Sequence, residues 1–124
     1  MNITSFSPMV LTKNAKETIR LFEELGFQKR HAPTIDTGTS MASGITMADA
    51  NGFRVDVADV QGLSQDATII RVNVDDFDEA YKMLTAKGFT HHKGYQAVSM
   101  PSSKSALMES PSGVSIYLVQ HIKK

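Results

Sequence analysis

The pattern of apolar and polar positions along the chain predicts two amphipathic helices. Apolar residues recur at helical spacing in two separate stretches, which comprise Ile19, Leu21, Phe22 and Leu25 in the first and Ala80, Tyr81, Met83 and Leu84 in the second. Each stretch is closed by a glycine, Gly26 or Gly88, the residue best suited to the left-handed position that follows a helix. We therefore expect one helix just before each of these glycines.

The two predicted helices also begin alike. Asn14 and Asp76 are N-cap candidates, and each is followed three residues later by a glutamate, Glu17 or Glu79, which is the capping-box pattern. The closing glycines lie 62 positions apart, and so do the two caps. Because caps, apolar faces and closing turns agree at one offset, the sequence indicates an internal duplication.

Strand-like segments surround both helices. We place them at Ile3 to Leu11, Gln28 to Pro33, Thr39 to Met47 and Phe53 to Val57, and again at Thr68 to Val74, His91 to Val98, Ser105 to Glu109 and Val114 to Val119. A polar, glycine-containing linker, Gln61 to Asp66, separates the two sets. Each half therefore reads strand, helix and three strands. We expect a single domain over 1–124, with module one at about residues 1–60 and module two at about 67–121.

Alternation within the strands separates an apolar face from a mixed one. The apolar face, expected to lie against the helices, carries Val10, Phe53, Val55, Val57, Ile70, Val72, Val74, Val114, Ile116 and Leu118. The candidates for ligand binding lie on the mixed face and are Ser7, Met9, Arg54, Asp56, Arg71, Asn73 and Tyr117. In one interpretation Arg71 or Arg54 pairs with an anionic or carbonyl-bearing ligand while Tyr117 stacks on it or donates a hydrogen bond. In the other, Arg54 or Arg71 forms an ion pair with Asp56 at a solvated surface.

Composition narrows the classes of function. The 124 residues include 13 basic and 13 acidic side chains, so the net charge gives no field for nucleic acid or an anionic membrane. No cysteine is present, which excludes disulfides and thiolate chemistry. The start of the chain lacks the pattern of a signal peptide, and no apolar run approaches the roughly 18 residues of a membrane span. We expect a cytoplasmic protein that binds neither nucleic acid nor membranes.

His91 and His92 suggest metal binding at first sight. Adjacent residues of a strand point to opposite faces, so this pair cannot chelate one ion from a strand. An ordinary pair of strand or loop histidines is the simpler interpretation.

Three segments together resemble a known superfamily. They run from Asn14 to Phe27, from Val74 to Phe89 and from Glu109 to Leu118. The resemblance is to the vicinal oxygen chelate superfamily, which contains glyoxalase I, bleomycin-resistance proteins and extradiol dioxygenases. It implies an α+β fold of two βαβββ modules whose curved mixed sheets surround a cavity, with the helices on the outer face. It also implies a homodimer, in which the modules pair within one chain or swap between chains.

The resemblance also places the metal-ligand positions of the superfamily on this sequence. They fall on Ser7 and Asp56 in the first half and on Ile69 and Tyr117 in the second. Only Asp56 is an ordinary ligand for a divalent cation, whereas such sites generally need three or more His or carboxylate ligands. We therefore expect no metal and no cofactor.

Three functions are compatible with these observations. The first is a metal-independent binding protein of the bleomycin-resistance type, which holds a planar or amphipathic small molecule in the concave cavity. The second is an enzyme of the same superfamily, a lyase, isomerase or dioxygenase relative acting on a carbonyl compound, with Asp56 as general base and Arg71 as electrostatic stabiliser. The third is a non-catalytic scaffold whose cavity is filled by its own side chains.

Overall fold

The computed structural model describes residues 1–31, 34–36, 41–61, 63–91, 98–100 and 103–122. These residues form two compact units. The N-terminal unit contains the described residues of Ser7–Ile35 and Met41–Thr68, and the C-terminal unit contains Met1–Phe6 together with the described residues of Asp36–Ser40 and Ile69–Lys124. Each unit is described by itself below.

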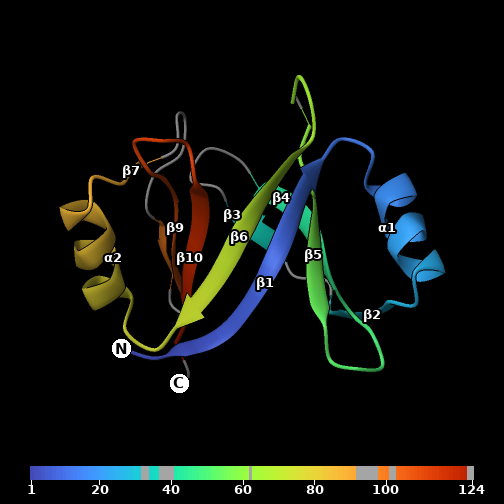
Figure 1. The fold of residues 1–124 in the computed structure, drawn as a ribbon, viewed down its shortest axis with the longest axis horizontal. Coiled ribbons are helices and arrows are strands. Elements are labelled where there is room, and N and C mark those ends of the chain that lie inside the picture. Colours follow the sequence, from blue (N-terminus) through green and yellow to red (C-terminus); the bar gives the residue numbers. More distant parts are fainter. Residues whose placement is uncertain (32–33, 37–40, 62, 92–97, 101–102, 123–124) are drawn as a thin grey trace. The chain divides into compact units, whose positions relative to one another are not determined.

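Two helices and ten strands are described (Figure 1). In chain order they are β1 (Ile3–Thr12), α1 (Ala15–Glu24), β2 (Gln28–His31), β3 (Thr34–Asp36), β4 (Met41–Ala48), β5 (Arg54–Asp59), β6 (Ala67–Val74), α2 (Phe77–Ala86), β7 (Thr90–His91), β8 (Val98–Met100), β9 (Ser103–Glu109) and β10 (Ser115–His121). Neither helix is long and apolar enough to cross a bilayer, as judged over the described part of the chain.

The N-terminal unit has the strand order β2-β4-β5-β1. β1 and β5 are parallel, β4 is antiparallel to both β5 and β2, and β3 pairs with β4. α1 packs beside β5 (Figure 1). Its core is a cluster of buried and partly buried apolar side chains that comprises Met47, Val55, Val57, Val10, Ala15, Ile19, Phe22, Phe27 and Ile45. The side chains of the α1 face and of alternate strand positions thus meet on one side of this sheet.

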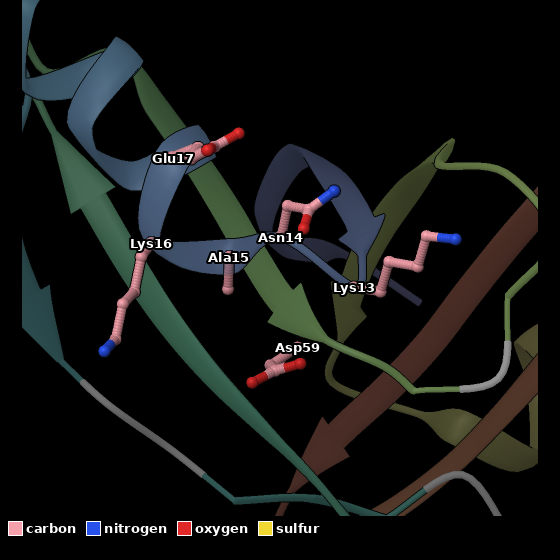
Figure 2. A pocket seen from close by; sticks show the side chains of 6 residues that line it. All are labelled: Lys13, Asn14, Ala15, Lys16, Glu17 and Asp59. Atoms are coloured by element: carbon pink, nitrogen blue, oxygen red, sulfur yellow. The ribbon is translucent and has the colours of Figure 1, made fainter.

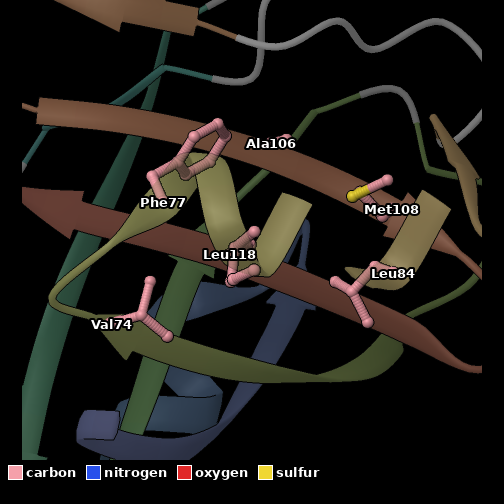
Figure 3. Packing of buried hydrophobic residues seen from close by; sticks show 7 residues of the cluster. Val74, Phe77, Leu84, Ala106, Met108 and Leu118 are labelled. Atoms are coloured by element: carbon pink, nitrogen blue, oxygen red, sulfur yellow. The ribbon is translucent and has the colours of Figure 1, made fainter. Parts of the chain in front are cut away.

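The C-terminal unit repeats this plan with the order β7-β9-β10-β6. β6 and β10 are parallel, and β9 is antiparallel to β10, β7 and β8. α2 packs against β10. The buried core, shown in Figure 3, comprises Val74, Phe77, Ala80, Leu84, Ala106, Met108 and Leu118. A parallel pair and a helix that covers it therefore form the centre of each unit.

The predicted α+β class and the order strand, helix and further strands are confirmed. The predicted apolar face is also confirmed in most strands, because Val10, Val55 and Val57 pack with α1 and Val72, Val74, Ile116 and Leu118 pack with α2. Phe53 and Val114 differ, since both are exposed. Each immediately precedes its strand, where the sheet no longer covers the side chain.

One predicted strand differs from the observed structure, and one observed strand was not predicted. The segment predicted as His91 to Val98 contains only the end of β7 and the start of β8, and 92–97 lie outside the described residues. β3, at Thr34–Asp36, was not predicted as a separate strand. The predicted ends at Pro33 and Thr39 also lie outside the described residues.

The capping box predicted for α1 is wrong. The Asn14 side chain makes no capping hydrogen bond, and the Asn14 backbone N–H instead donates to Thr12 Oγ1 at 2.9 Å. Asp76 does cap α2, because its Oδ1 accepts a hydrogen bond from the Glu79 N–H at 3.0 Å. The backbone decides this difference, since Asp76 is extended whereas Asn14 is outside the β region that cap residues normally adopt.

Candidate functional site

A buried carboxylate marks the helix-free face of the N-terminal unit. Asp56 of β5 is 3% exposed, and each of its oxygens accepts a hydrogen bond from a hydroxyl group. Thr46 Oγ1, on β4, donates to Oδ1 at 2.7 Å, and the Ser7 hydroxyl, on β1, donates to Oδ2. Hydroxyl donors to a carboxylate form charge-assisted hydrogen bonds, which are stronger than neutral ones. We call these three residues the Asp56 cluster.

Strand register brings the Asp56 cluster together. Thr46 lies directly opposite Asp56 in the antiparallel β4–β5 pair, and Met9 is the partner of Asp56 in the parallel β1–β5 pair. Ser7 precedes Met9 by two residues and therefore projects from the same face of β1. Val55 and Val57 point the other way, toward α1, which leaves Asp56 on the face opposite the helix.

A cation and an aromatic ring occupy the helix-free face of the C-terminal unit. Arg71 Nε, on β6, donates to Asn73 Oδ1 at 3.1 Å. The Cζ atom of the Arg71 guanidinium group lies 6.0 Å from the centroid of the Tyr117 ring, within the range of a cation–π interaction. Tyr117 of β10 is the register partner of Arg71 in the parallel pair. This group of three residues is the Arg71 cluster.

The seven predicted site residues thus fall into two groups. In the N-terminal unit Ser7 and Asp56 are in contact, Met9 is their buried neighbour, and Arg54 lies at the start of β5 with an exposed side chain. The other three form the Arg71 cluster. Ser7, Met9, Asp56, Asn73 and Tyr117 are all buried, and Arg71 is partly buried.

Thr46 is the site residue that the sequence analysis missed. The predicted strand Thr39 to Met47 contains Thr46, but alternating faces were assigned only in other strands. The signal was present, because Ile45 and Met47 are apolar and alternation places Thr46 on the opposite face.

The donor atoms at the superfamily's metal positions do not fit a divalent metal ion. Ile69 offers no donor atom, and the Ser7 hydroxyl, which donates a hydrogen bond to Asp56, is a neutral and weak metal ligand. Across the described part of the chain, no three His, Cys, Asp or Glu side chains gather as a group that could hold a metal. His91 makes a hydrogen bond to the hydroxyl of Tyr81 on α2, and His92 lies outside the described residues.

Pockets that lie within one unit are found beside the helices. A pocket of about 390 Å³ opens at the start of α1 (Figure 2), and its lining comprises Lys13, Asn14, Ala15, Lys16, Glu17 and Asp59. A second, of about 250 Å³, continues between α1 and the strands β4 and β5. A third, of about 140 Å³ and wholly apolar, adjoins α2. None of these three reaches the Asp56 cluster or the Arg71 cluster.

The position equivalent to Asp59 of this pocket is Gln120 in the C-terminal unit. There the Gln120 amide joins β10 to the start of α2, because Oε1 accepts from the Phe77 N–H at 2.8 Å and Nε2 donates to the Asp75 carbonyl at 2.9 Å. Asp59 holds the equivalent position in the N-terminal unit, but its shorter carboxylate accepts from Gln61 at 2.6 Å. Asp59 and Gln120 therefore differ in their hydrogen-bond partners, although they hold equivalent positions in the two units.

Comparison with known proteins gives structural matches alone. No family model and no curated protein matches the sequence. A glyoxalase/bleomycin resistance protein/dioxygenase superfamily member from Vibrio splendidus 12B01 is similar in structure over 96% of this chain and 99% of that one, at 13% identity and a TM-score of 0.62. Methylmalonyl-CoA epimerase from Mycobacterium tuberculosis matches 98% of this chain and 90% of its own, at 14% identity and a TM-score of 0.70.

A glyoxalase I mutant from Zea mays is similar over 98% of this chain, which spans 44% of the length of that protein, at 12% identity and a TM-score of 0.69. At such identities a structural likeness establishes the fold and leaves the activity open. The resemblance inferred from the sequence is thereby confirmed at the level of the fold: the chain has the fold of the vicinal oxygen chelate superfamily.

Proposed function

We propose that the chain is a small-molecule binding protein of the glyoxalase/bleomycin-resistance type that works without a metal ion. The ligand would meet the sheet face opposite the helices. The observation that carries this proposal is the Arg71 cluster, in which a guanidinium group is held by Asn73 beside the Tyr117 ring. A fixed cation next to an aromatic face is typical of recognition sites.

The chemistry of the Arg71 cluster favours a planar ligand that carries a carboxylate or a carbonyl group. A guanidinium group presents its N–H donors in one plane, which matches the two oxygens of a carboxylate. The Tyr117 ring adds a surface on which a flat apolar ligand can stack. Such a ligand is amphipathic, with one charged or carbonyl end and an apolar body.

A ligand screen tests the proposal. Planar aromatic carboxylates and their uncharged amides would be screened by thermal shift, and the hits would be titrated calorimetrically. We expect the carboxylates to bind, and Arg71→Gln to weaken binding at least tenfold because a charge-assisted hydrogen bond is lost. Arg20→Gln, on the exposed surface of α1, is the matched control and should leave the affinity unchanged. Equal binding to both arginine variants would contradict the assignment.

Metal content tests the second part of the proposal. Protein purified without chelators would be offered zinc, nickel, manganese and iron and then examined by elemental analysis. The donor set at Ser7, Asp56, Ile69 and Tyr117 leads us to expect far less than one equivalent per chain. Tight binding of about one equivalent would overturn the metal-free proposal and favour a metal-dependent lyase or dioxygenase.

Two alternatives have their own supporting observations. Asp56 is a carboxylate on the face where a substrate would lie, so an enzyme acting on a carbonyl compound could use it as a general base. In that case Asp56→Asn should abolish turnover and spare binding.

The burial of five of the seven candidate residues instead favours a scaffold without ligand. A screen in which no compound binds would support the scaffold.

A further inference from the structure

We propose that the Ser7 and Thr46 hydroxyl groups hold the buried Asp56 carboxylate in place, as a bound metal ion holds a carboxylate ligand. Thr46 is then a positioning residue for Asp56. The hydroxyl groups would hold both oxygens and fix the side chain on the helix-free face. This inference shares one premise with the proposed function, namely that the protein works without a metal ion.

Hydrogen-bond accounting supports the inference. A carboxylate that is 3% exposed has lost most of its hydration, and its burial without compensating partners would destabilise the fold. Here each oxygen has a hydroxyl donor of its own, and the two donors come from different strands. Ser7 and Thr46 are themselves buried, so neither hydroxyl is simply a solvated surface group.

The arrangement crosses three neighbouring strands. β4, β5 and β1 are adjacent in the sheet, and they contribute Thr46, Asp56 and Ser7 respectively. Because Thr46 is the direct cross-strand partner of Asp56, no change of backbone is needed for its hydroxyl to reach Oδ1. The cluster therefore links the strands at a place where a bound cation would link several carboxylate or imidazole ligands.

The second unit supplies an internal comparison. Its register is the same, since Arg71 pairs with Tyr117 as Met9 pairs with Asp56. The residues equivalent to Ser7, Asp56 and Thr46 are Ile69, Tyr117 and Leu107. Leu107 lies opposite Tyr117 as Thr46 lies opposite Asp56.

All three equivalents are also buried, at 6%, 9% and 6% exposure for Ile69, Tyr117 and Leu107. The C-terminal unit thus forms the same arrangement of strands without a carboxylate at these positions, and without hydroxyl groups that donate to one. The cluster is therefore not a requirement of the fold. The carboxylate and its two donors are present together in one unit and replaced together in the other, as expected of residues that act as a set.

The composition of the Asp56 cluster does not favour a divalent ion. Each carboxylate oxygen already accepts a hydrogen bond from a hydroxyl group, and Asp56 is the only carboxylate of the cluster. Neutral hydroxyl groups are weak ligands, and Asp56 alone is too few. Thr46 is as important as Ser7 here, although no superfamily metal position falls on it.

A double-mutant cycle tests the role of Thr46. Thr46→Val removes the hydroxyl with almost no change of shape, and we expect the Tm to fall by roughly 5 °C or more, as for loss of one charge-assisted hydrogen bond in a domain of this size. Thr46→Ser keeps the hydroxyl and should recover most of the loss. Thr68→Val, at an exposed strand position, is the matched control and should change the Tm little.

Thr46→Val is then made in an Asp56→Ala background, where we expect it to leave the Tm unchanged. If the Asp56→Ala variant does not fold, Asp56→Asn takes its place. The decrease in Tm caused by Thr46→Val should then be smaller, because the acceptor is no longer charged. If Thr46→Val lowers the Tm equally with and without Asp56, or if Thr46→Ser does not recover the Tm, Thr46 is not a positioning residue for Asp56. These outcomes are distinct from the metal and ligand tests of the proposed function, which do not depend on Thr46.

Zinc and a chelator complete the test. Added zinc chloride or EDTA should leave the Tm of the unsubstituted chain unchanged. A rise in Tm with zinc that disappears in Asp56→Ala would show that Asp56 is a metal ligand and would overturn the inference.

Discussion

Asp75 shows how one residue ties together segments that are distant in sequence. Its Oδ1 accepts from the backbone N–H of Asn2 at 2.7 Å, and its Oδ2 accepts from the Asn2 side-chain amide at 3.2 Å. The backbone N–H of Asn2, more than any other group, holds the pKa of Asp75 below its ordinary value of 3.8. Hydrogen bonds that favour the charged form therefore make this link dependent on pH.

The sign of that dependence gives a prediction. Because the pKa of Asp75 is lower in the folded chain than in the unfolded chain, its contribution to stability is complete above pH 3.8 and is lost as the pH falls through the lowered value. We expect Asp75→Asn to lower the urea midpoint at pH 6 and to show a smaller further loss on acidification than the unsubstituted chain. Urea titrations between pH 2.5 and 6 measure this, with exposed Glu24→Gln on α1 as the control. Parallel pH profiles for the unsubstituted chain and Asp75→Asn would contradict the assignment.

At the scale of elements, the two helices have the same length and different starts. Both are ten residues long and are followed by glycines with positive φ, 107° at Gly26 and 94° at Gly88. α2 is capped by Asp76, whereas the backbone N–H of Asn14 is bound by Thr12 and the Asn14 side chain does not cap α1. An identical sequence pattern therefore stabilises one helix start and leaves the other without a side-chain cap.

This difference predicts unequal effects of the same substitution. Asp76→Ala should lower the free energy of unfolding by about 1 kcal/mol, because the cap of α2 is lost. Asn14→Ala should change it by less than about 0.5 kcal/mol, since no capping bond is removed. Equilibrium urea denaturation of the two variants measures both values, and each serves as the control of the other. A larger loss for Asn14→Ala would show that Asn14 caps α1 in solution.

At the scale of the whole molecule, each unit has a core of its own around a helix and a parallel strand pair. Several large apolar side chains nevertheless remain exposed, namely Ile3, Phe6, Leu21, Leu25, Phe53 and Val114. Where such side chains form a contiguous patch, they mark a surface at which subunits associate. The homodimer expected from the superfamily resemblance would give them a partner surface.

The dimer is tested by its mass. Light scattering coupled to size exclusion should give twice the chain mass of 13.6 kDa at micromolar concentration. A decrease toward the chain mass on dilution would show reversible association. A constant mass of one chain at high concentration would contradict the dimer.

The sequence by itself determined the elements and their faces. The helical spacing of Ile19 to Leu25 and of Ala80 to Leu84, and the alternation in 53–57 and 114–119, arise from local periodicity, which is why these elements were predictable. Periodicity also placed Asp56, Arg71, Asn73 and Tyr117 on the face opposite the helices. The fold class was implied by the superfamily resemblance of three segments, and the order of the amphipathic elements agrees with it.

Tertiary structure alone decided which polar groups meet. Cross-strand register joins Thr46 and Ser7 to Asp56, from which they lie 10 and 49 residues away in the chain, and it places Arg71 beside Tyr117. Backbone conformation decided that Asp76 caps its helix and that Asn14 does not. Register and backbone angles depend on the packing of the entire unit, whereas side-chain periodicity depends only on neighbours in the chain. For this physical reason the elements and the faces of most strands could be predicted from the sequence, and the hydrogen bonds that join the Asp56 cluster could not.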